Sequence, residues 1–275
     1  MHAPSPTDLV DLERYPLLDL TSPVRSELLA TLRRQLEERG AAILPGFLRP
    51  QTCIHINREI DRLLPGAFRE DVWGTAYLGL PEEAYAEGHP RRTTVRSVTW
   101  VIAYDLIPRT AAARALYEWE PLLGFVAEVL GRERIYRYAD PMGGLNLTSM
   151  IEGDVQGWHY DAAEFVVSIG LQSGDAGGEF ECAPFLRRDG DEHYDEVARI
   201  IADLGSDRVG VFPIVPGTMM IFEGRDSLHR VSPIQGKTER RIMLLGYDTS
   251  PGTQGSDLLK LIRYGRTESR EPPLD

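Results

Sequence analysis

The second half of the chain is divided into short apolar runs by turn residues, and this pattern restricts the fold more than any other feature of the sequence. Pairs rich in glycine, proline and aspartate separate the runs. Many short strands at regular spacing are typical of an all-β sandwich or barrel. We expect one helix at about 191–204 to interrupt them. The expected strands are 135–138, 145–152, 157–161, 164–171, 178–182, 209–213, 218–222, 229–233 and 241–247.

The first half of the chain has mainly helical patterns. Ser22 and Pro23 form a helix start, and Gly40 ends an amphipathic stripe that runs to Arg39. No linker divides the chain, so we expect one domain over 1–275, with 1–130 as mainly helical support and 131–266 as the β core. The fold class is therefore mainly β with flanking α-helices. The expected elements are helices at 23–39, 51–64, 110–118 and 121–130 and strands at 41–46 and 98–106, with 66–95 unassigned.

The charge balance and the cysteine content restrict partners and compartment. The chain has 30 Lys and Arg against 42 Asp and Glu, a formal net charge of −12, so nucleic acid and anionic membranes are poor partners. The acidic N-terminus does not resemble a signal peptide, and no apolar run approaches the ~18 residues of a membrane span. Cys53 and Cys182 are too few for a disulfide framework. We expect a cytoplasmic protein; a homodimer is one alternative for its oligomeric state.

The most informative motif is His159-Tyr160-Asp161. Residues two apart in a strand face the same side, so the imidazole of His159 and the carboxylate of Asp161 can bind one divalent metal. His229, at the start of a later strand, is the candidate third ligand. Two histidines and one carboxylate form the facial triad of non-haem Fe(II) oxygenases, which leaves half of an octahedral iron open. Taken alone, a His-x-Asp motif is more often a surface pair.

Two adjacent arginines open the apolar strand that follows His229. A buried arginine needs an anionic partner, and the distal carboxylate of a dicarboxylate cosubstrate can supply it in a bidentate pair. Neighbouring strand residues face opposite sides, so we expect one of Arg240 and Arg241 to be solvated. Solvation of both at the strand end is the alternative.

These residues resemble the Fe(II)/2-oxoglutarate-dependent oxygenases, and longer strings are similar to the BesD/HalD-like family of free-amino-acid halogenases and hydroxylases. The match is densest from about 135 to 266. The strings that carry it are Leu145 to Leu147, Gly157 to Asp161, Gly177 to Glu181, Ser227 to Pro233, Tyr247 to Gly252 and Arg263 to Arg266.

The resemblance implies a double-stranded β-helix, or jelly roll, that binds Fe(II), 2-oxoglutarate and O2. The iron ligands would be the two histidines and the aspartate already named. Arg241 matches the arginine that binds the distal carboxylate of 2-oxoglutarate, and Arg240 is the less favoured choice. Asn146 and Thr148 would line the pocket and contact 2-oxoglutarate, although ordinary strand-end hydrogen bonding explains them equally well.

The retained Asp161 separates two reactions. In the halogenases of this group a small residue replaces the carboxylate ligand and opens a site for chloride. Asp161 leaves no such site, so we expect a hydroxylase that converts 2-oxoglutarate to succinate and CO2. The alternatives are a radical halogenase, a cupin metalloenzyme that uses no 2-oxo acid, and a non-catalytic jelly-roll module.

The expected substrate is a small molecule, a free amino acid or a derivative of one. Such a substrate needs a cation for its carboxylate and an anion for its amine. Arg96 falls about where the family's carboxylate-binding arginine would lie, although a solvated arginine is the simpler reading. Gln156 precedes His159 by three residues, where some lysine-acting members carry another residue type. The candidate partners for the amine are Asp140, Asp248, Glu179 and Glu181.

Overall fold

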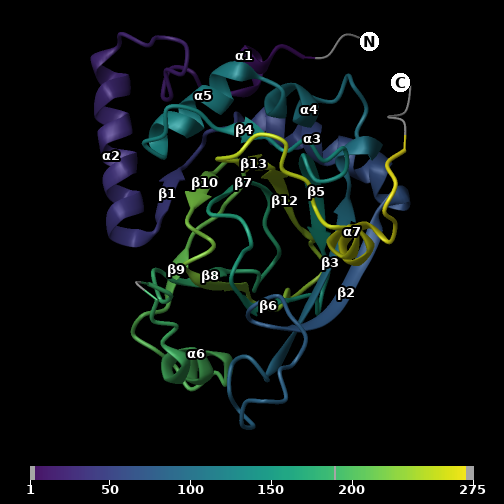
Figure 1. Ribbon diagram of the computed structural model, residues 1–275. Helices are drawn as coiled ribbons and strands as arrows, with labels where there is room; N and C mark the ends of the chain where they lie inside the picture. Colours follow the sequence, from purple (N-terminus) through teal and green to yellow (C-terminus); the bar gives the residue numbers. More distant parts are fainter. Residues whose placement is uncertain (1–3, 189, 271–275) are drawn as a thin grey trace.

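An antiparallel sheet that curls into a half-barrel of the double-stranded β-helix type dominates the fold, and helices flank it (Figure 1). The computed structural model describes residues 4–188 and 190–270. Within those ranges eleven strands join this sheet in the order β1-β10-β7-β12-β5-β3-β6-β11-β8-β9, with β2 paired to β3. The strands are β1 Ala41–Leu44, β2 Phe68–Thr75, β3 Thr94–Ile102, β5 Leu145–Met150, β6 Gln156–His159, β7 Val166–Gln172, β8 Phe180–Ala183, β9 Gly210–Phe212, β10 Met219–Phe222, β11 Leu228–Val231 and β12 Arg240–Leu245.

Alternation along the strands gives the sheet two different faces. On β7, Val167, Ile169 and Leu171 belong to the large core beneath the helices. Alternate positions such as Ser168 face the opposite side, because strand side chains alternate. The inner face carries its own apolar cluster, which includes Met150 and Phe222. A barrel with both a packed outside and a partly polar inside follows from this alternation.

The flanking helices cover the outer face of the sheet. Ser22 accepts a hydrogen bond from the Arg25 backbone N–H at the start of α2, and Gly40, at φ 66°, ends it. α2 packs on β1, and α3 packs on β7. Figure 1 shows α2 to α5 gathered on one side of the barrel and α6 and α7 beside other parts of its rim. The helices are α1 Pro6–Leu9, α2 Pro23–Arg39, α3 Pro50–Leu63, α4 Ala112–Tyr117, α5 Glu120–Val129, α6 Tyr194–Ile201 and α7 Asp257–Tyr264.

The structure confirms the mainly β class and most predicted elements, but it also contains β2, α7 and a small second sheet, which the sequence did not predict. β2 forms within the unassigned stretch 66–95, and α7 follows the last strand of the sheet. The first 130 residues, which we expected to be mainly helical support, supply β1, β2 and β3 to the sheet. A small separate sheet pairs β4 Tyr136–Arg137 with β13 Tyr247–Asp248. In the described ranges, no helix is both long and apolar enough to span a membrane.

Candidate metal centre and cosubstrate pocket

Three side chains from different segments converge on one point inside the barrel. His159 ends β6 and pairs directly with His229 of β11, and the two ring centroids are 4.3 Å apart. Asp161 follows β6; its Oδ1 is 3.7 Å from His159 Nε2, and its Oδ2 is 3.3 Å from His229 Nε2. All three ligand atoms lie within 4.8 Å of one another. The His-Asp-His triad expected from the sequence is therefore present.

Hydrogen bonds direct both imidazoles toward this point. Nδ1 of His159 is 2.7 Å from the Gly157 carbonyl oxygen, and Nδ1 of His229 is 2.9 Å from the Ser227 carbonyl oxygen. A carbonyl only accepts, so each Nδ1 carries the proton and each Nε2 presents a lone pair. Burial lowers the pKa of His229 to about 4, so its ring is neutral at neutral pH.

The electrostatics of the triad fit a bound cation. Asp161 Oδ2 is buried and has no hydrogen-bond partner among the described residues, although the lone pair of His229 Nε2 lies 3.3 Å away. Two nitrogen lone pairs and a carboxylate that face one another repel unless a positive charge lies between them. Two imidazoles and one carboxylate with open positions are the ligand set of non-haem Fe(II) sites.

Arg240 lies on the inner face of the barrel. It pairs across the sheet with Met150, and its Nη1 is 4.0 Å from Met150 Sδ. A Cβ placed on Gly178 would lie 2.8 Å from Arg240 Cδ, so the side chain packs directly on that glycine. Burial lowers the pKa of Arg240 to about 10, and no carboxylate of the described residues pairs with it. A buried cation without an anion is costly, which suits a site for an anionic ligand.

Arg241 has the opposite environment, on the outer face. Its Nη1 is 2.7 Å from Asp61 of α3, and its Nη2 is 2.8 Å from Glu239. Nη1 also donates to the Asn57 carbonyl oxygen at 3.2 Å. The sequence favoured Arg241 as the cosubstrate arginine, whereas the geometry favours Arg240. Arg240 and Arg241 have different environments because successive strand residues face opposite sides and α3 supplies an acidic partner to the outer one.

Asn146 and Thr148 share the inner face of β5. Nδ2 of Asn146 donates to the carbonyl oxygens of Met142 and Leu145, and its Oδ1 accepts from the Tyr264 hydroxyl at 3.0 Å. Thr148 Oγ1 donates to the Ile242 carbonyl oxygen at 3.3 Å. Both side chains line the interior with their own partners already in place.

Ser168 is an interior residue that the sequence analysis missed. It pairs with Leu244 and Met220, and its buried hydroxyl has no partner among the described residues. The strand 164–171 was predicted, but its register was not. The signal that could have found Ser168 is a lone hydroxyl among apolar residues at the interior-facing phase of that strand.

Two of the predicted substrate residues have structural partners instead. Arg96 forms a bidentate pair with Asp71 on the surface, where both side chains are more than 40% exposed. Asp140 is buried and accepts hydrogen bonds from the backbone N–H groups of Met142, Gly143 and Gly255. The charged groups of both side chains therefore already have partners within the protein.

Gln156 lies on the strand that carries His159, whereas Asp248 caps a turn. Val231 pairs with Gln156 and His229 pairs with His159, with a register shift between them. Residues directly opposite each other share a face, so Gln156 lies on the interior side with His159 despite the three-residue spacing. Asp248 Oδ1 accepts from the Ser250 backbone N–H and the Thr249 hydroxyl, which makes it a turn cap first. The two other amine candidates are bound locally, Glu179 to Ser232 and Glu181 to Arg230.

Arg263 of α7 is a second functional candidate that sequence reasoning did not single out. Its Nη1 is 3.3 Å from Glu70 of β2, and Glu70 is buried. Burial opposes the charge of Arg263, but Glu70, Tyr264 and Asp161 outweigh it and raise its pKa. The charge of Asp161 also acts on Tyr138: burial together with Asp248 and Asp161 raises the pKa of Tyr138 to about 12. The signal for Arg263 was its place in the Arg-Tyr-Gly-Arg string of the family resemblance.

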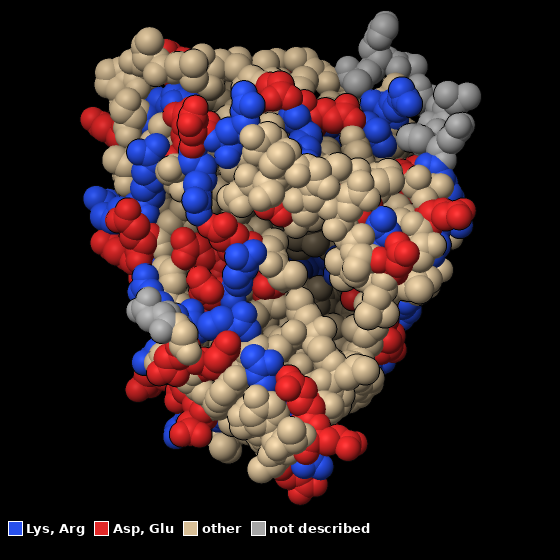
Figure 2. Space-filling model, in the orientation of Figure 1, with Lys and Arg blue, Asp and Glu red and all other residues tan. Residues whose placement is uncertain are grey.

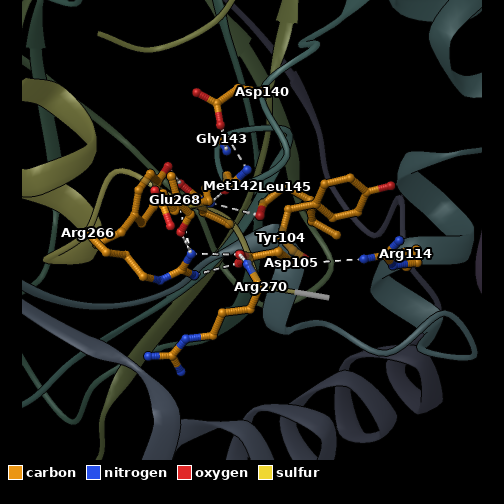
Figure 3. Close-up of polar contacts among 12 residues, drawn as sticks. Tyr104, Asp105, Arg114, Asp140, Met142, Gly143, Leu145, Arg266, Glu268 and Arg270 are labelled. Atoms are coloured by element: carbon orange, nitrogen blue, oxygen red, sulfur yellow. Dashed lines mark hydrogen bonds and ion pairs between the residues drawn. The ribbon is translucent and has the colours of Figure 1, made fainter. Parts of the chain in front are cut away.

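A hollow opens in the middle of the barrel face (Figure 2), and basic side-chain surface lies in its depth while uncharged residues form most of its rim. The segment after α7 is fixed beside this face by a polar network (Figure 3). Asp105 accepts both Nη groups of Arg266, at 2.7 and 2.6 Å, and the Arg270 backbone N–H at 2.6 Å. Lys260, in the middle of α7, lies 3.6 Å from Asp140, so both the helix and the segment after it are anchored.

The half-barrel and the His-Asp-His triad define a protein of the 2-oxoglutarate/Fe(II) oxygenase superfamily. The sequence profile of the HalD (Halogenase D) family matches residues 24–256, and the chain belongs to that family. No curated protein sequence matches the chain.

Solved structures of the superfamily share the fold. A 2OG-Fe(II) oxygenase family oxidoreductase from Burkholderia pseudomallei is 20% identical, with a TM-score of 0.51 over 82% of this chain and 92% of that one. A prolyl hydroxylase from Trichoplax adhaerens is 14% identical, with a TM-score of 0.55 over 85% and 95%. The α-ketoglutarate-dependent epimerase SnoN of nogalamycin biosynthesis is 14% identical, with a TM-score of 0.55 over 91% and 97%. At this identity the likeness concerns the fold.

Proposed function

We propose that this HalD-family enzyme hydroxylates an unactivated C–H bond of a free amino acid or a derivative, with conversion of 2-oxoglutarate to succinate and CO2. The observation that carries the proposal is the complete triad, with its carboxylate retained, in a barrel that also buries an unpaired arginine. The triad supports a metal with open positions, and the arginine supports a dicarboxylate cosubstrate.

His159, Asp161 and His229 would hold the ferrous ion. When bound, the iron supplies with 2-oxoglutarate and O2 the oxidising chemistry that replaces hydrogen by hydroxyl. The protein contributes fixed ligand positions, since the Gly157 and Ser227 carbonyls hold the imidazoles in the correct tautomer. The buried Asp161 Oδ2, which has no hydrogen-bond partner in the described chain, supports its role as the third donor.

Arg240 would bind the distal carboxylate of 2-oxoglutarate, in place of the Arg241 favoured by the sequence. A guanidinium and a carboxylate form a bidentate pair, and burial strengthens it by excluding water. Ser168 offers an unpartnered hydroxyl on the same face for a further hydrogen bond, and Thr148, which donates to the Ile242 carbonyl oxygen, lines that face. Asn146 supports the pocket wall through its bonds to Met142 and Tyr264.

Arg263 and Glu70 would recognise the charged end of the substrate. A zwitterionic amino acid offers a carboxylate to Arg263 and an ammonium group to Glu70, and these two side chains already form a mostly buried pair at 3.3 Å. Gln156, on the interior face, can add a hydrogen bond. Arg96 pairs with Asp71, and Asp140 accepts backbone hydrogen bonds, so we do not assign either to the substrate. Asp248 is a weaker candidate, supported only by its electrostatic effect on Tyr138.

The direct test uses anaerobically purified protein with Fe(II), 2-oxoglutarate and a pool of free amino acids, followed by admission of air. We expect mass spectrometry to detect succinate and an amino acid heavier by one oxygen atom. The Asp161→Ala variant should form no hydroxylated product. A chlorinated product from the wild type would favour the halogenase alternative, and absence of succinate with every substrate would reject the oxygenase proposal.

The substrate end is tested by comparing two arginines once a substrate is known. Arg263→Met should raise KM by about 10–100-fold, the cost of removing one charged hydrogen-bond donor. Arg96→Met is the matched control, because Arg96 pairs on the surface, and we expect its KM to stay within about twofold of the wild type. An equal effect of both substitutions would contradict the role of Arg263.

A further inference from the structure

The loop after β10 touches the carboxylate ligand through a glycine. Gly224 accepts a hydrogen bond from the Asp161 backbone N–H at 3.0 Å. Next to it, Arg225 donates from Nε and Nη2 to the Ala162 carbonyl oxygen at 3.3 and 3.1 Å. These three bonds tie residues 161–162 to 224–225 and fix the separation of the two backbones.

No side chain fits at position 224 with the carboxylate where it is. A Cβ on Gly224 would lie 2.0 Å from Asp161 Oδ2, 2.9 Å from its Cγ and 3.0 Å from its Cβ. Gly224 is not among the glycines with positive φ, so its backbone conformation is open to other residues. The reason for glycine here is space, and the atom that occupies this space is the unpartnered oxygen of the triad.

We propose that Gly224 is a positioning residue that determines whether Asp161 can act as a metal ligand. The absence of a side chain lets Oδ2 lie 3.3 Å from His229 Nε2, in the donor cluster. A methyl group at 224 cannot push the backbones apart, because the hydrogen bonds hold them, so the Asp161 side chain must rotate. Rotation carries the carboxylate out of the cluster and leaves two histidine ligands.

The inference rests on the proposed metal site, and its test measures metal binding rather than turnover. Metal-free wild type and Gly224→Ala are titrated with Co(II) under anaerobic conditions and followed by the visible absorption of the bound ion. We expect Gly224→Ala to bind Co(II) about 10–100-fold more weakly, the usual cost of disturbing the groups that orient a metal ligand. Gly66→Ala is the control, since nothing lies within 4 Å of its Cβ position, and it should bind as the wild type does.

A double-mutant cycle separates the steric effect from general damage. Once Asp161→Gly has removed the carboxylate, adding Gly224→Ala should cause no further loss of Co(II) affinity, because nothing remains to be displaced. If Gly224→Ala fails to fold while the double variant folds, the steric account also holds. Failure of both to fold, equal losses in the two backgrounds, or wild-type affinity in Gly224→Ala would overturn it. A wild type that takes up no Co(II) would instead overturn the proposed metal site, and this inference with it.

Discussion

Buried charges have partners within the protein in the network that anchors the C-terminal segment, but they lack such partners in the barrel interior. In the network, Asp105 and Arg266 satisfy each other, and Asp140 accepts three backbone N–H groups (Figure 3). In the interior, Arg240 and Asp161 Oδ2 are buried without such partners among the described residues. Both regions use the same residue types, aspartate and arginine.

The difference shows how burial separates structural from functional charge. Removing a charge from water costs several kcal/mol unless a partner and hydrogen bonds compensate it. The network has this compensation within the protein, so its charges hold α7 and the following segment against the barrel. The interior lacks it, so its charges are stabilised only when a ligand of opposite charge binds. The contrast predicts that one kind of substitution has opposite effects in the two regions.

The largest expected effect is a difference in stability between two arginine-to-methionine variants, one in each region. Arg266→Met leaves Asp105, whose side chain is only 2% exposed, without its cation and should lower the free energy of unfolding by about 3–5 kcal/mol. Arg240→Met removes an unpaired buried charge and should leave the ligand-free protein as stable as the wild type or more stable. Chemical denaturation of both variants checks this; a loss of stability in Arg240→Met as large as that in Arg266→Met would refute the contrast.

The next effect concerns cosubstrate affinity at adjacent positions of β12. Arg240→Met should weaken 2-oxoglutarate binding by about 2–5 kcal/mol, since it removes one partner of a buried charged pair. Arg241→Met should leave that affinity unchanged and lower stability by about 1 kcal/mol through its outer-face pairs. Calorimetric titration with 2-oxoglutarate and Co(II) measures both. If Arg241→Met weakens 2-oxoglutarate binding more than Arg240→Met does, Arg241 is the cosubstrate arginine, as the sequence resemblance implied.

The smallest effect is the contribution of Asp140, in the network, to the pH dependence of stability. Burial opposes the ionised form of Asp140, but hydrogen bonds from Met142, Gly255 and Gly143 and the charge of Lys260 hold its pKa below the ordinary value. An unfolded aspartate titrates at about 3.9. The folded state therefore binds fewer protons near that pH, so the stabilisation is complete above it and is lost as the pH falls through the lower folded pKa.

Asp140→Asn removes this dependence. The variant should be about 1 kcal/mol less stable than the wild type at neutral pH, and the difference should shrink as the solution is acidified. Denaturation at a series of pH values measures it. A difference that stays constant down to the acid range would show that the charge of Asp140 contributes nothing to the anchor.

The sequence by itself determined the chemistry of the site, because the triad depends on residue types and on local spacing. His159 and Asp161 are two apart at a strand end, and His229 opens a later strand. The turn-punctuated runs predicted the β core, since strand alternation and turn chemistry are local properties. The same local logic predicted that Arg240 and Arg241 face opposite sides. The resemblance favoured Arg241 for the cosubstrate, and we expected one of the two to be solvated, whereas the structure buries both side chains.

Only the tertiary structure decided which charged side chains have partners of opposite charge within the protein, and where those partners lie. Arg241 pairs with Asp61 and Arg96 pairs with Asp71, so each already has a carboxylate partner within the protein. α7 lies against β2 and brings the Arg263 guanidinium to the buried Glu70, which is the pair that we propose for the substrate. These partners are distant in sequence, and a pairing between distant segments depends on register and packing. Burial and compensation of charge are therefore properties of the folded chain, which no local pattern records.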